Sequence, residues 1–281
     1  MRSVRLRGRP RCATRAMVRC PLMRRRVSRW GRIVGTGAAF ALFGLLGVAL
    51  GLSVYPAAKR CSSDPRVGEF RVQRLVHWTF RAFVRFMKLL GLVELSVHGA
   101  ERLRAPSARL IVANHPTLLD VVMLGSLMPQ LDCVVKREAW SNPFMRGVVT
   151  SAGYIPNDLG EDVLAACAER LQQGRRVLLF PEGTRSPKGQ LGTFRRGAAH
   201  VALSSQAPIL PVVIRCEPAS LMRGQKWYDV PDEKLRFSIE VGEVLDPRSL
   251  VGDREPRASA ARDVTRALRD FYAKTLQTLS V

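Results

Sequence analysis

The stretch RLIVANHPTLLD, residues 109–120, indicates both how this chain folds and where its chemistry lies. After its first residue, the run Arg109–Ala113 is apolar and is predicted to form a buried strand. The strand leads into a turn that carries His115, and Asp120 follows about one helical turn later. An imidazole held by a carboxylate can take a proton from a hydroxyl, because the carboxylate fixes the tautomer of the ring. The stretch therefore predicts a strand that ends in a general base.

A second block, FPEGTRS at residues 180–186, follows the apolar run Val177–Phe180, which is also a predicted strand. Arg185, on a loop that contains glycine, can bind an anionic group, and a structural salt bridge with Glu182 is the alternative. Ligands of open α/β sheets commonly bind beyond the carboxyl ends of strands, so we expect the two blocks to converge on one crevice. Without this second block, His115 would be interpreted as a helix-capping or buried structural histidine.

Outside these blocks, short apolar runs alternate with amphipathic stretches. Strands are predicted at Cys133–Lys136, Ile209–Arg215 and Leu235–Val241, and helices at 118–128, Asn142–Ala152, Glu161–Gln173, Gly197–Ser205 and Ser259–Leu279. Because strands and helices alternate, the fold class is predicted to be α/β, with a single, largely parallel or mixed sheet. The 281 residues suffice for one globular domain of roughly 200 residues plus an appendage.

The N-terminal part of the chain is first basic and then apolar. Residues 1–32 hold twelve Arg and no acidic residue, and are predicted to be a basic leader. This leader could be a transit peptide, a basic cytoplasmic tail, or an extension before a true start at Met23. No charge lies between Ile33 and Ala58, so residues 33–58 are predicted to be a transmembrane or membrane-embedded helix, for which about 20 apolar residues suffice. A cleaved signal peptide is the alternative, but the apolar run is longer than such peptides carry.

Residues 69–95 are predicted to form an amphipathic helix at the membrane surface. Basic residues at 71, 74, 81, 85 and 88 recur at helical spacing, and apolar residues with Trp78 fill the opposite side. Such a helix can lie among lipid headgroups, its cations on phosphates. A surface helix that packs on the domain core is the alternative that the pattern leaves open.

Charge and cysteine content narrow the range of partners. The net charge is +22, and without the leader 33 basic and 23 acidic residues still leave about +10. A basic chain favours anionic lipid surfaces or phosphate-bearing substrates, and the absence of aromatic-interleaved or zinc-finger motifs predicts no nucleic-acid partner. The six cysteines form no Cys-x-x-Cys pair, so we expect reduced, mostly buried thiols in a cytosol-facing domain, and no metal.

Taken together, the motifs resemble those of the glycerolipid acyltransferase family, typified by 1-acylglycerol-3-phosphate acyltransferases. NHPTLLD at 114–120 is similar to the family's His-x4-Asp block, and FPEGTRS at 180–186 to its acceptor-binding block. APILPV at 207–212 is similar to its fourth, proline-containing block, and the stretch from Val135 to Pro156 resembles the region leading into its second block. The resemblance covers roughly residues 70–250. It implies that residues 96–281 are an acyltransferase domain and that the helices before this domain anchor it to a membrane.

The resemblance also implies roles for individual residues. His115 would be the general base on an acceptor hydroxyl, with Asp120 orienting it. Residues that would bind the substrates are Glu182, Gly183, Thr184 and Arg185 for the acceptor, with Arg185 on a phosphate, and Pro211 in the wall for the acyl donor. The acceptor hydroxyl would attack the thioester of acyl-CoA or acyl-carrier protein, a co-substrate, without a covalent acyl-enzyme, a cofactor or a metal.

The implied enzyme is an O-acyltransferase that acts on a lysophospholipid such as 1-acylglycerol-3-phosphate and gives phosphatidic acid. One position departs from the family's pattern, because Leu159 stands where the second block usually has an Arg that holds the acceptor phosphate. One lost charge-assisted hydrogen bond weakens binding by roughly 1.5–3 kcal/mol. Compensating cations would be Arg195, Arg196 or Lys136. The alternatives are a different lipid or specialised-metabolite acceptor, and a non-catalytic lipid-binding protein.

The resemblance implies a membrane location, in a bacterial inner membrane with the catalytic domain facing the cytosol, and membrane lipids as partners. The donors are cytosolic, which supports this orientation. However, an Arg-rich leader that stays in the cytoplasm would place a domain outside after a single crossing. A re-entrant or monotopic arrangement of residues 33–58 would resolve this conflict.

Overall fold

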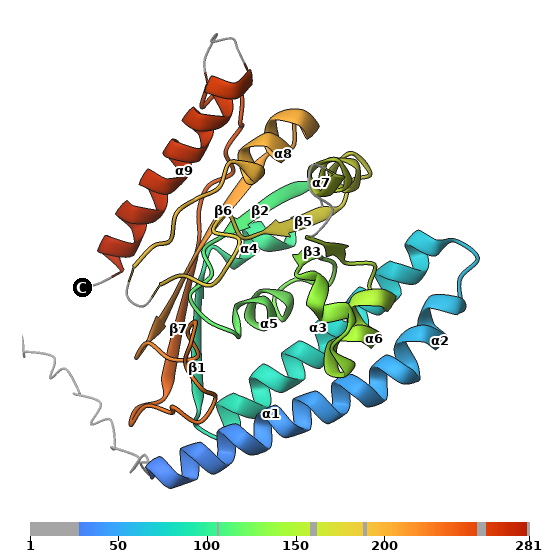
Figure 1. Ribbon diagram of the computed structural model, residues 1–281, viewed down its shortest axis with the longest axis vertical. Helices are drawn as coiled ribbons and strands as arrows, with labels where there is room; N and C mark the ends of the chain where they lie inside the picture. The colour runs from blue at the N-terminus through green and yellow to red at the C-terminus, as the bar shows by residue number, and fades with distance from the viewer. Residues whose placement is uncertain (1–27, 106, 158–161, 188–189, 252–256, 280–281) are drawn as a thin grey trace, which may run out of the picture.

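A computed structural model describes residues 28–105, 107–157, 162–187, 190–251 and 257–279. Its centre is a seven-stranded sheet with the order β1-β7-β6-β2-β5-β3-β4 (Figure 1). The strands are β1 (Val93–His98), β2 (Arg109–Ala113), β3 (Asp132–Val135), β4 (Ile155–Pro156), β5 (Arg176–Leu179), β6 (Ile209–Glu217) and β7 (Leu235–Val241). Neighbouring strands are parallel except β6 and β7, which are antiparallel. The predicted α/β class with a mixed sheet is confirmed.

Helices cover both faces of this sheet. The helical segments are α1 (Arg29–Leu52), α2 (Val54–Arg60), α3 (Pro65–Leu89), α4 (Ala100–Arg104), α5 (Asp120–Gly125), the 3-10 turn η1 (Arg137–Trp140), α6 (Pro143–Ser151), α7 (Asp162–Gln172), α8 (Gly197–Ser205) and α9 (Arg257–Thr278). Because successive strand residues point to opposite faces, Ile111 packs with α3 and α5, whereas Leu110 and Val112 pack with α7, α8 and α9. Two apolar cores therefore sandwich the strand that leads to His115.

The helix predicted at residues 69–95 differs from this range at both ends. It begins at Pro65, because the Asp64 side chain caps it by accepting a hydrogen bond from the Arg66 N–H at 2.8 Å. It ends at Leu89, and Gly91, with a φ of 68°, turns the chain into β1. The sheet thus starts at Val93, and a domain boundary at residue 96 would cut β1 in two.

The outer face of α3 is cationic. Its exposed residues include Arg71, Arg74, Trp78, Arg81, Arg85 and Lys88, and its inner face buries Val72, Val76, Phe83, Val84 and Met87. Trp78 lies on the cationic side, not on the apolar side where it was expected, with its ring centroid 5.6 Å from the guanidinium carbon of Arg81. The helix packs on the domain core, as the second interpretation of its pattern requires, and presents its cations outward.

Buried polar side chains attach α3 to the sheet. Arg175 donates two hydrogen bonds of 2.6 Å to Asp132 and one of 2.8 Å to Glu69 of α3. Gln73 of α3 donates to Asp132 at 3.0 Å and accepts from the Leu131 N–H at 3.1 Å. These mutual bonds compensate for the desolvation that burying charged groups costs.

The N-terminal helices pack against α3 and α6, with α1 along one edge of the molecule (Figure 1). The predicted helix 33–58 corresponds to α1 and α2, which meet at Ser53, and α1 already starts inside the predicted leader, at Arg29. Gly51 of α1 touches Gly147 of α6, since a Cβ on Gly51 would lie 2.9 Å from the Gly147 Cα.

The outer side of α1 is apolar and is not covered by the other residues that the structure describes. Its exposed large residues are Trp30, Val34, Leu42, Leu45, Leu46 and Leu52. Among the described residues, the helical stretch Arg29–Arg60 is both long enough and apolar enough to cross a membrane, judged by its length and composition. Residues 1–27 of the predicted leader, with Met23, lie outside the described residues.

Candidate active site

The predicted His–Asp pair forms at the end of β2. Nδ1 of His115 lies 2.8 Å from Oδ2 of Asp120, the first residue of α5. Asp120 is fully buried, and Thr117 donates to it from its N–H at 2.8 Å and from its hydroxyl at 2.6 Å. An ionised carboxylate only accepts hydrogen bonds, so this geometry assigns the proton to Nδ1 and leaves Nε2 as the acceptor.

Packing holds the His115 ring in place and leaves it accessible. The ring stacks on Phe180 of the second block, with centroids 4.1 Å apart and an angle of 20° between the planes. The His115 side chain remains 19% exposed. Complete burial raises the pKa of the Asp120 carboxyl, while hydrogen bonds from His115 and Thr117 act in the opposite direction.

Glu182 joins the two blocks. One carboxylate oxygen accepts from the His115 N–H at 3.0 Å and from the Ser186 hydroxyl at 2.8 Å, and the other accepts from the Gly192 N–H at 2.9 Å. The Ser186 N–H donates in turn to the His115 carbonyl at 2.7 Å. The buried carboxylate of Glu182 therefore positions the main chain of His115, a role that the sequence did not predict.

Arg185 binds carbonyl groups of the loop between β6 and β7, and the salt bridge with Glu182 that was the structural alternative does not form. Its Nη1 donates to the carbonyls of Leu221 and Met222, both at 3.0 Å. The Leu221 carbonyl also accepts from the Leu118 N–H at 3.0 Å. Leu221 itself has a φ of 57°, which is uncommon for a residue with a side chain. Because both blocks donate hydrogen bonds to the Leu221 carbonyl, this loop connects them. No motif in the loop's sequence predicted that role.

The turn at Gly183 requires glycine and lies beneath a further cation. Gly183 has a φ of 66°, and its N–H donates to the Phe180 carbonyl at 3.0 Å. A Cβ at this position would lie 3.2 Å from Nε of Arg195, so the Arg195 side chain lies over the turn. Thr184, the next residue along the chain, is half-buried. Arg195, one of the cations suggested to compensate for Leu159, therefore lies over the second block. Leu159 itself lies outside the described residues.

Pro211 is a core residue in this structure. It lies in β6 opposite Val112 of β2, is buried, and accepts a hydrogen bond from the Gly242 N–H at 2.9 Å. A Cβ on Gly242 would lie 2.9 Å from the proline ring. The ring is therefore covered by neighbouring protein atoms, and this conformation does not support the wall for the acyl donor that the resemblance implied.

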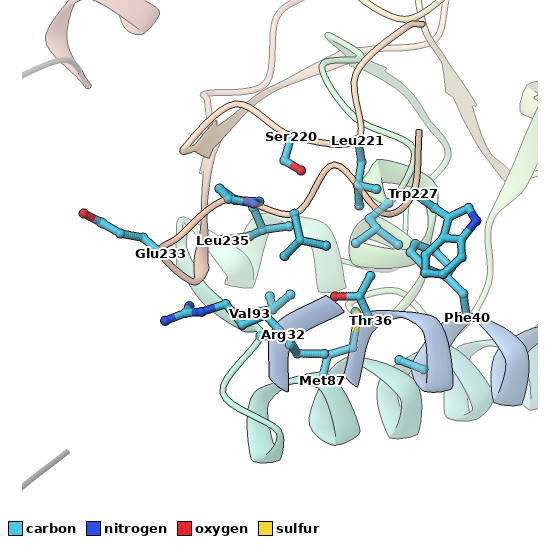
Figure 2. A pocket seen from close by; sticks show the side chains of 15 residues that line it. Arg32, Thr36, Phe40, Met87, Val93, Ser220, Leu221, Trp227, Glu233 and Leu235 are labelled. Carbon is cyan, nitrogen blue, oxygen red and sulfur yellow. The ribbon is translucent and has the colours of Figure 1, made fainter. Parts of the chain in front are cut away.

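A small apolar cavity lies beside the His115–Asp120 turn (Figure 2). Leu119 and Leu221 line it on the side of the site, and Thr36, Phe40, Met87 and Trp227 are among the residues on its other sides. Its volume of about 30 Å³ holds water molecules but no fatty acyl chain. Trp227 packs over Gly37 of α1, where a Cβ would lie 2.9 Å from the indole ring.

Comparisons with known proteins agree with this fold. Residues 94–215 match the Acyltransferase family. The chain is 35% identical over 153 residues to a 1-acyl-sn-glycerol-3-phosphate acyltransferase of Saccharomyces cerevisiae, which covers 50% of each protein. It is 37% identical over 114 residues to a protein of the same name from Helicobacter pylori, covering 38% of this chain and 48% of that protein. The chain thus spans about half the length of the curated relatives it matches.

The fold also resembles a solved structure. The crystal structure of a 1-acyl-sn-glycerophosphate acyltransferase from Thermotoga maritima matches 86% of this chain and 97% of that protein, with a TM-score of 0.65 and 18% identity. This likeness is one of fold, and the segment that matches the Acyltransferase family, residues 94–215, contains both blocks. Within this class, the relatives described above carry the name of 1-acyl-sn-glycerol-3-phosphate acyltransferases, as the sequence motifs predicted.

Proposed function

We propose that this chain is a membrane-bound O-acyltransferase. It transfers a fatty acyl group from acyl-CoA or acyl-carrier protein to the hydroxyl of a lysophospholipid such as 1-acylglycerol-3-phosphate, and the product is phosphatidic acid. The 2.8 Å contact between Nδ1 of His115 and Asp120 carries the proposal, because it makes Nε2 of an accessible imidazole a proton acceptor. The names of the relatives that share this domain support the choice of substrate.

The proposed reaction needs one base and no further reagent. Nε2 of His115 takes the proton of the acceptor hydroxyl while its oxygen attacks the thioester carbonyl. The new C–O bond forms, the C–S bond breaks, and the departing thiolate receives the proton from the imidazolium. Asp120 stabilises that imidazolium, and general-base assistance of this kind is worth about 10²–10⁴ in rate.

The second block supports an anionic acceptor. Arg185 uses Nη1 for the two loop carbonyls, and its other nitrogens still carry N–H donors for a phosphate. The guanidinium of Arg195, which lies over the Gly183 turn, adds a second positive charge. Gly183 and Thr184 form the backbone between these cations.

The N-terminal helices support attachment to membrane lipids. The exposed apolar side of α1 suits the hydrocarbon layer, and the exposed Arg and Lys side chains of α3 suit anionic headgroups. This arrangement would keep the acyltransferase domain at the membrane surface, where lysophospholipids reside. The cytosolic face of a bacterial inner membrane is the proposed location, because thioester donors are cytosolic.

The test uses the purified full chain in detergent micelles with a palmitoyl thioester and a panel of lyso-lipids. Thiol release that requires 1-acylglycerol-3-phosphate and yields phosphatidic acid supports the proposal. Release without any acceptor would identify a hydrolase, and no release would identify a binding protein. Acylation of other lipids alone would support the second candidate, an acyltransferase for a different acceptor, which Leu159 in place of the family's Arg favours.

A further inference from the structure

The hydroxyl of Tyr272 lies at the last paired rung of β2 and β6. It donates to the Val112 carbonyl of β2 at 2.5 Å and accepts from the Val212 N–H of β6 at 3.2 Å. The register pairs Val112 with Pro211 and Ala113 with Val212, so the two main-chain groups belong to the last two adjacent pairs between these strands. One phenol hydroxyl from α9 thus links the C-terminal end of β2 to β6.

Tyr272 is placed for this contact by complete burial. Its ring is 0% exposed and packs edge-on against Phe194, with centroids 5.1 Å apart. Phe194 precedes Arg195, the residue that lies over the Gly183 turn. Burial raises the pKa of the Tyr272 hydroxyl, which therefore keeps its proton and remains a donor.

Asn114 continues the connection one step beyond the strand. Its side-chain amide donates to the Ile214 carbonyl at 2.8 Å and accepts from the Ile214 N–H at 2.7 Å. The side chain of Asn114 thereby imitates a further rung between the end of β2 and β6. His115 is the next residue, so its main chain leaves the sheet from a point that Tyr272 and Asn114 fix from one side and Glu182 fixes from the other.

We propose that Tyr272 is a positioning residue for His115, acting through the Val112 carbonyl and the exit of β2. The inference rests on the proposed function for its kinetic consequence. Tyr272 lies in α9, outside residues 94–215 that match the Acyltransferase family, so this role belongs to the C-terminal part of the chain. Loss of the hydroxyl lets the end of β2 shift against β6, which changes the direction in which the imidazole meets the acceptor.

The test compares Tyr272→Phe with Tyr55→Phe in the full chain. Tyr55 is a matched control, because this buried tyrosine of α2 also has a hydrogen-bonded hydroxyl, whose partner is the Thr79 hydroxyl at 3.2 Å. We expect Tyr272→Phe to lower kcat for 1-acylglycerol-3-phosphate about tenfold with KM changed less than about twofold, since small misplacements of reacting groups cost rate more than binding. Tyr55→Phe should leave kcat unchanged. Equal kcat values for the two variants would overturn the proposal.

A second readout does not depend on activity and so separates this proposal from the proposed function. The proton on Nδ1 of His115, hydrogen-bonded to Asp120, gives an NMR resonance that is assigned among the four histidines by its loss in His115→Ala. Tyr272→Phe should shift this resonance, and Tyr55→Phe should not. An unchanged resonance in Tyr272→Phe would overturn the positioning role even if the chain acylates no lipid.

Rescue distinguishes the hydroxyl from the ring. 4-Aminophenylalanine at position 272 retains an N–H donor for the Val112 carbonyl, and we expect it to keep kcat within about threefold of the wild type. This variant also serves if Tyr272→Phe fails to fold, because it preserves the bond that the proposal invokes. A folded 4-aminophenylalanine variant with a wild-type His115 resonance supports the inference, and a folded variant whose His115 resonance is displaced from the wild-type position contradicts it.

Discussion

The carboxylate of Glu182 accepts a hydrogen bond from the main-chain N–H of His115 at 3.0 Å, across 67 residues of sequence. The same carboxylate binds Ser186 and Gly192, so its position is set by the second block itself. The His115 turn after β2 and the loop after β5 are therefore joined by this carboxylate. A motif that resembles a substrate-binding loop also serves as the support of the proposed base.

Replacing Glu182 by Gln should lower catalysis more than acceptor binding. The amide would present an N–H₂ group to the N–H or O–H donors that now bind the carboxylate, and a buried donor left unpaired costs about 1–3 kcal/mol. We expect kcat to fall at least tenfold and the melting temperature to drop, with Glu138→Gln, an exposed site in η1, as control. A raised KM with an unchanged kcat would show instead that Glu182 acts only by contacting the acceptor.

Arg185→Ala should discriminate between charged and uncharged acceptors. If the guanidinium binds the acceptor phosphate, the KM for 1-acylglycerol-3-phosphate rises by about 10- to 100-fold, as the loss of roughly 1.5–3 kcal/mol predicts. The KM for an uncharged monoacylglycerol measures the effect of releasing the Leu221 and Met222 carbonyls alone, and it should change far less. Arg146→Ala in α6, an exposed site, is the control. Equal changes for both acceptors would exclude a phosphate contact.

Gly51→Ala should loosen α1 from the acyltransferase domain. The added methyl group would meet the Gly147 Cα at 2.9 Å, and overpacking against main-chain atoms costs about 1–3 kcal/mol. Gly35→Ala on the same helix is the control, since its Cβ would lie 3.5 Å from Leu92, an ordinary contact. Thermal unfolding in detergent should show a lower melting temperature for Gly51→Ala only. Identical melting curves would contradict the close approach of α1 and α6.

Glu69 makes the stability of the α3 attachment depend on pH. Partial burial raises the pKa of Glu69, but hydrogen bonds and charges from Arg170 and Arg175 outweigh it and lower the pKa below its ordinary value of 4.5. A carboxylate with a lowered pKa contributes stability above the unfolded value and loses it as the pH falls through the folded value.

We therefore expect Glu69→Gln to reduce the free energy of unfolding by roughly 1–3 kcal/mol at pH 7. The difference from wild type should start to shrink below about pH 4.5, where the carboxylate of the unfolded chain takes up its proton, and disappear as the pH falls through the lower pKa of the folded state. Chemical unfolding at pH 7, 5 and 4 measures it, with the exposed Glu101→Gln as control. A difference that stays constant over this range would mean that the two arginines do not stabilise the charged form.

Local sequence patterns predicted much of the fold. The bounds of Arg109–Ala113, Leu235–Val241 and Gly197–Ser205 agree with β2, β7 and α8, because each run is continuous in its apolar or alternating character. By contrast, β1 (Val93–His98) was not predicted, and its first half fell inside the helix predicted at residues 69–95, since over a few residues helical and alternating spacings coincide. The two residues of β4 pair only through contact with β3, which no local pattern records.

The contacts of the site likewise divide into those that the local sequence predicted and those that it did not. His115 and Asp120 are neighbours on one turn, so their spacing alone predicted the contact. Three hydrogen bonds of the site join segments far apart along the chain: those of Glu182 with His115, of Leu221 with Arg185 and of Tyr272 with Val112. Only the folded topology brings these segments together. Such long-range partners are ordinary Glu, Leu and Tyr residues whose type gives no signal of their role.

The central claim is that His115 is the base for acyl transfer to a lysophospholipid hydroxyl. The most direct measurement is a single-turnover reaction of the purified full chain with a palmitoyl thioester and 1-acylglycerol-3-phosphate, comparing wild type with His115→Ala by mass spectrometry of the lipid product. We predict phosphatidic acid from the wild type and a rate at least 10²-fold lower for His115→Ala. Equal rates of phosphatidic acid formation by the two proteins would contradict the account.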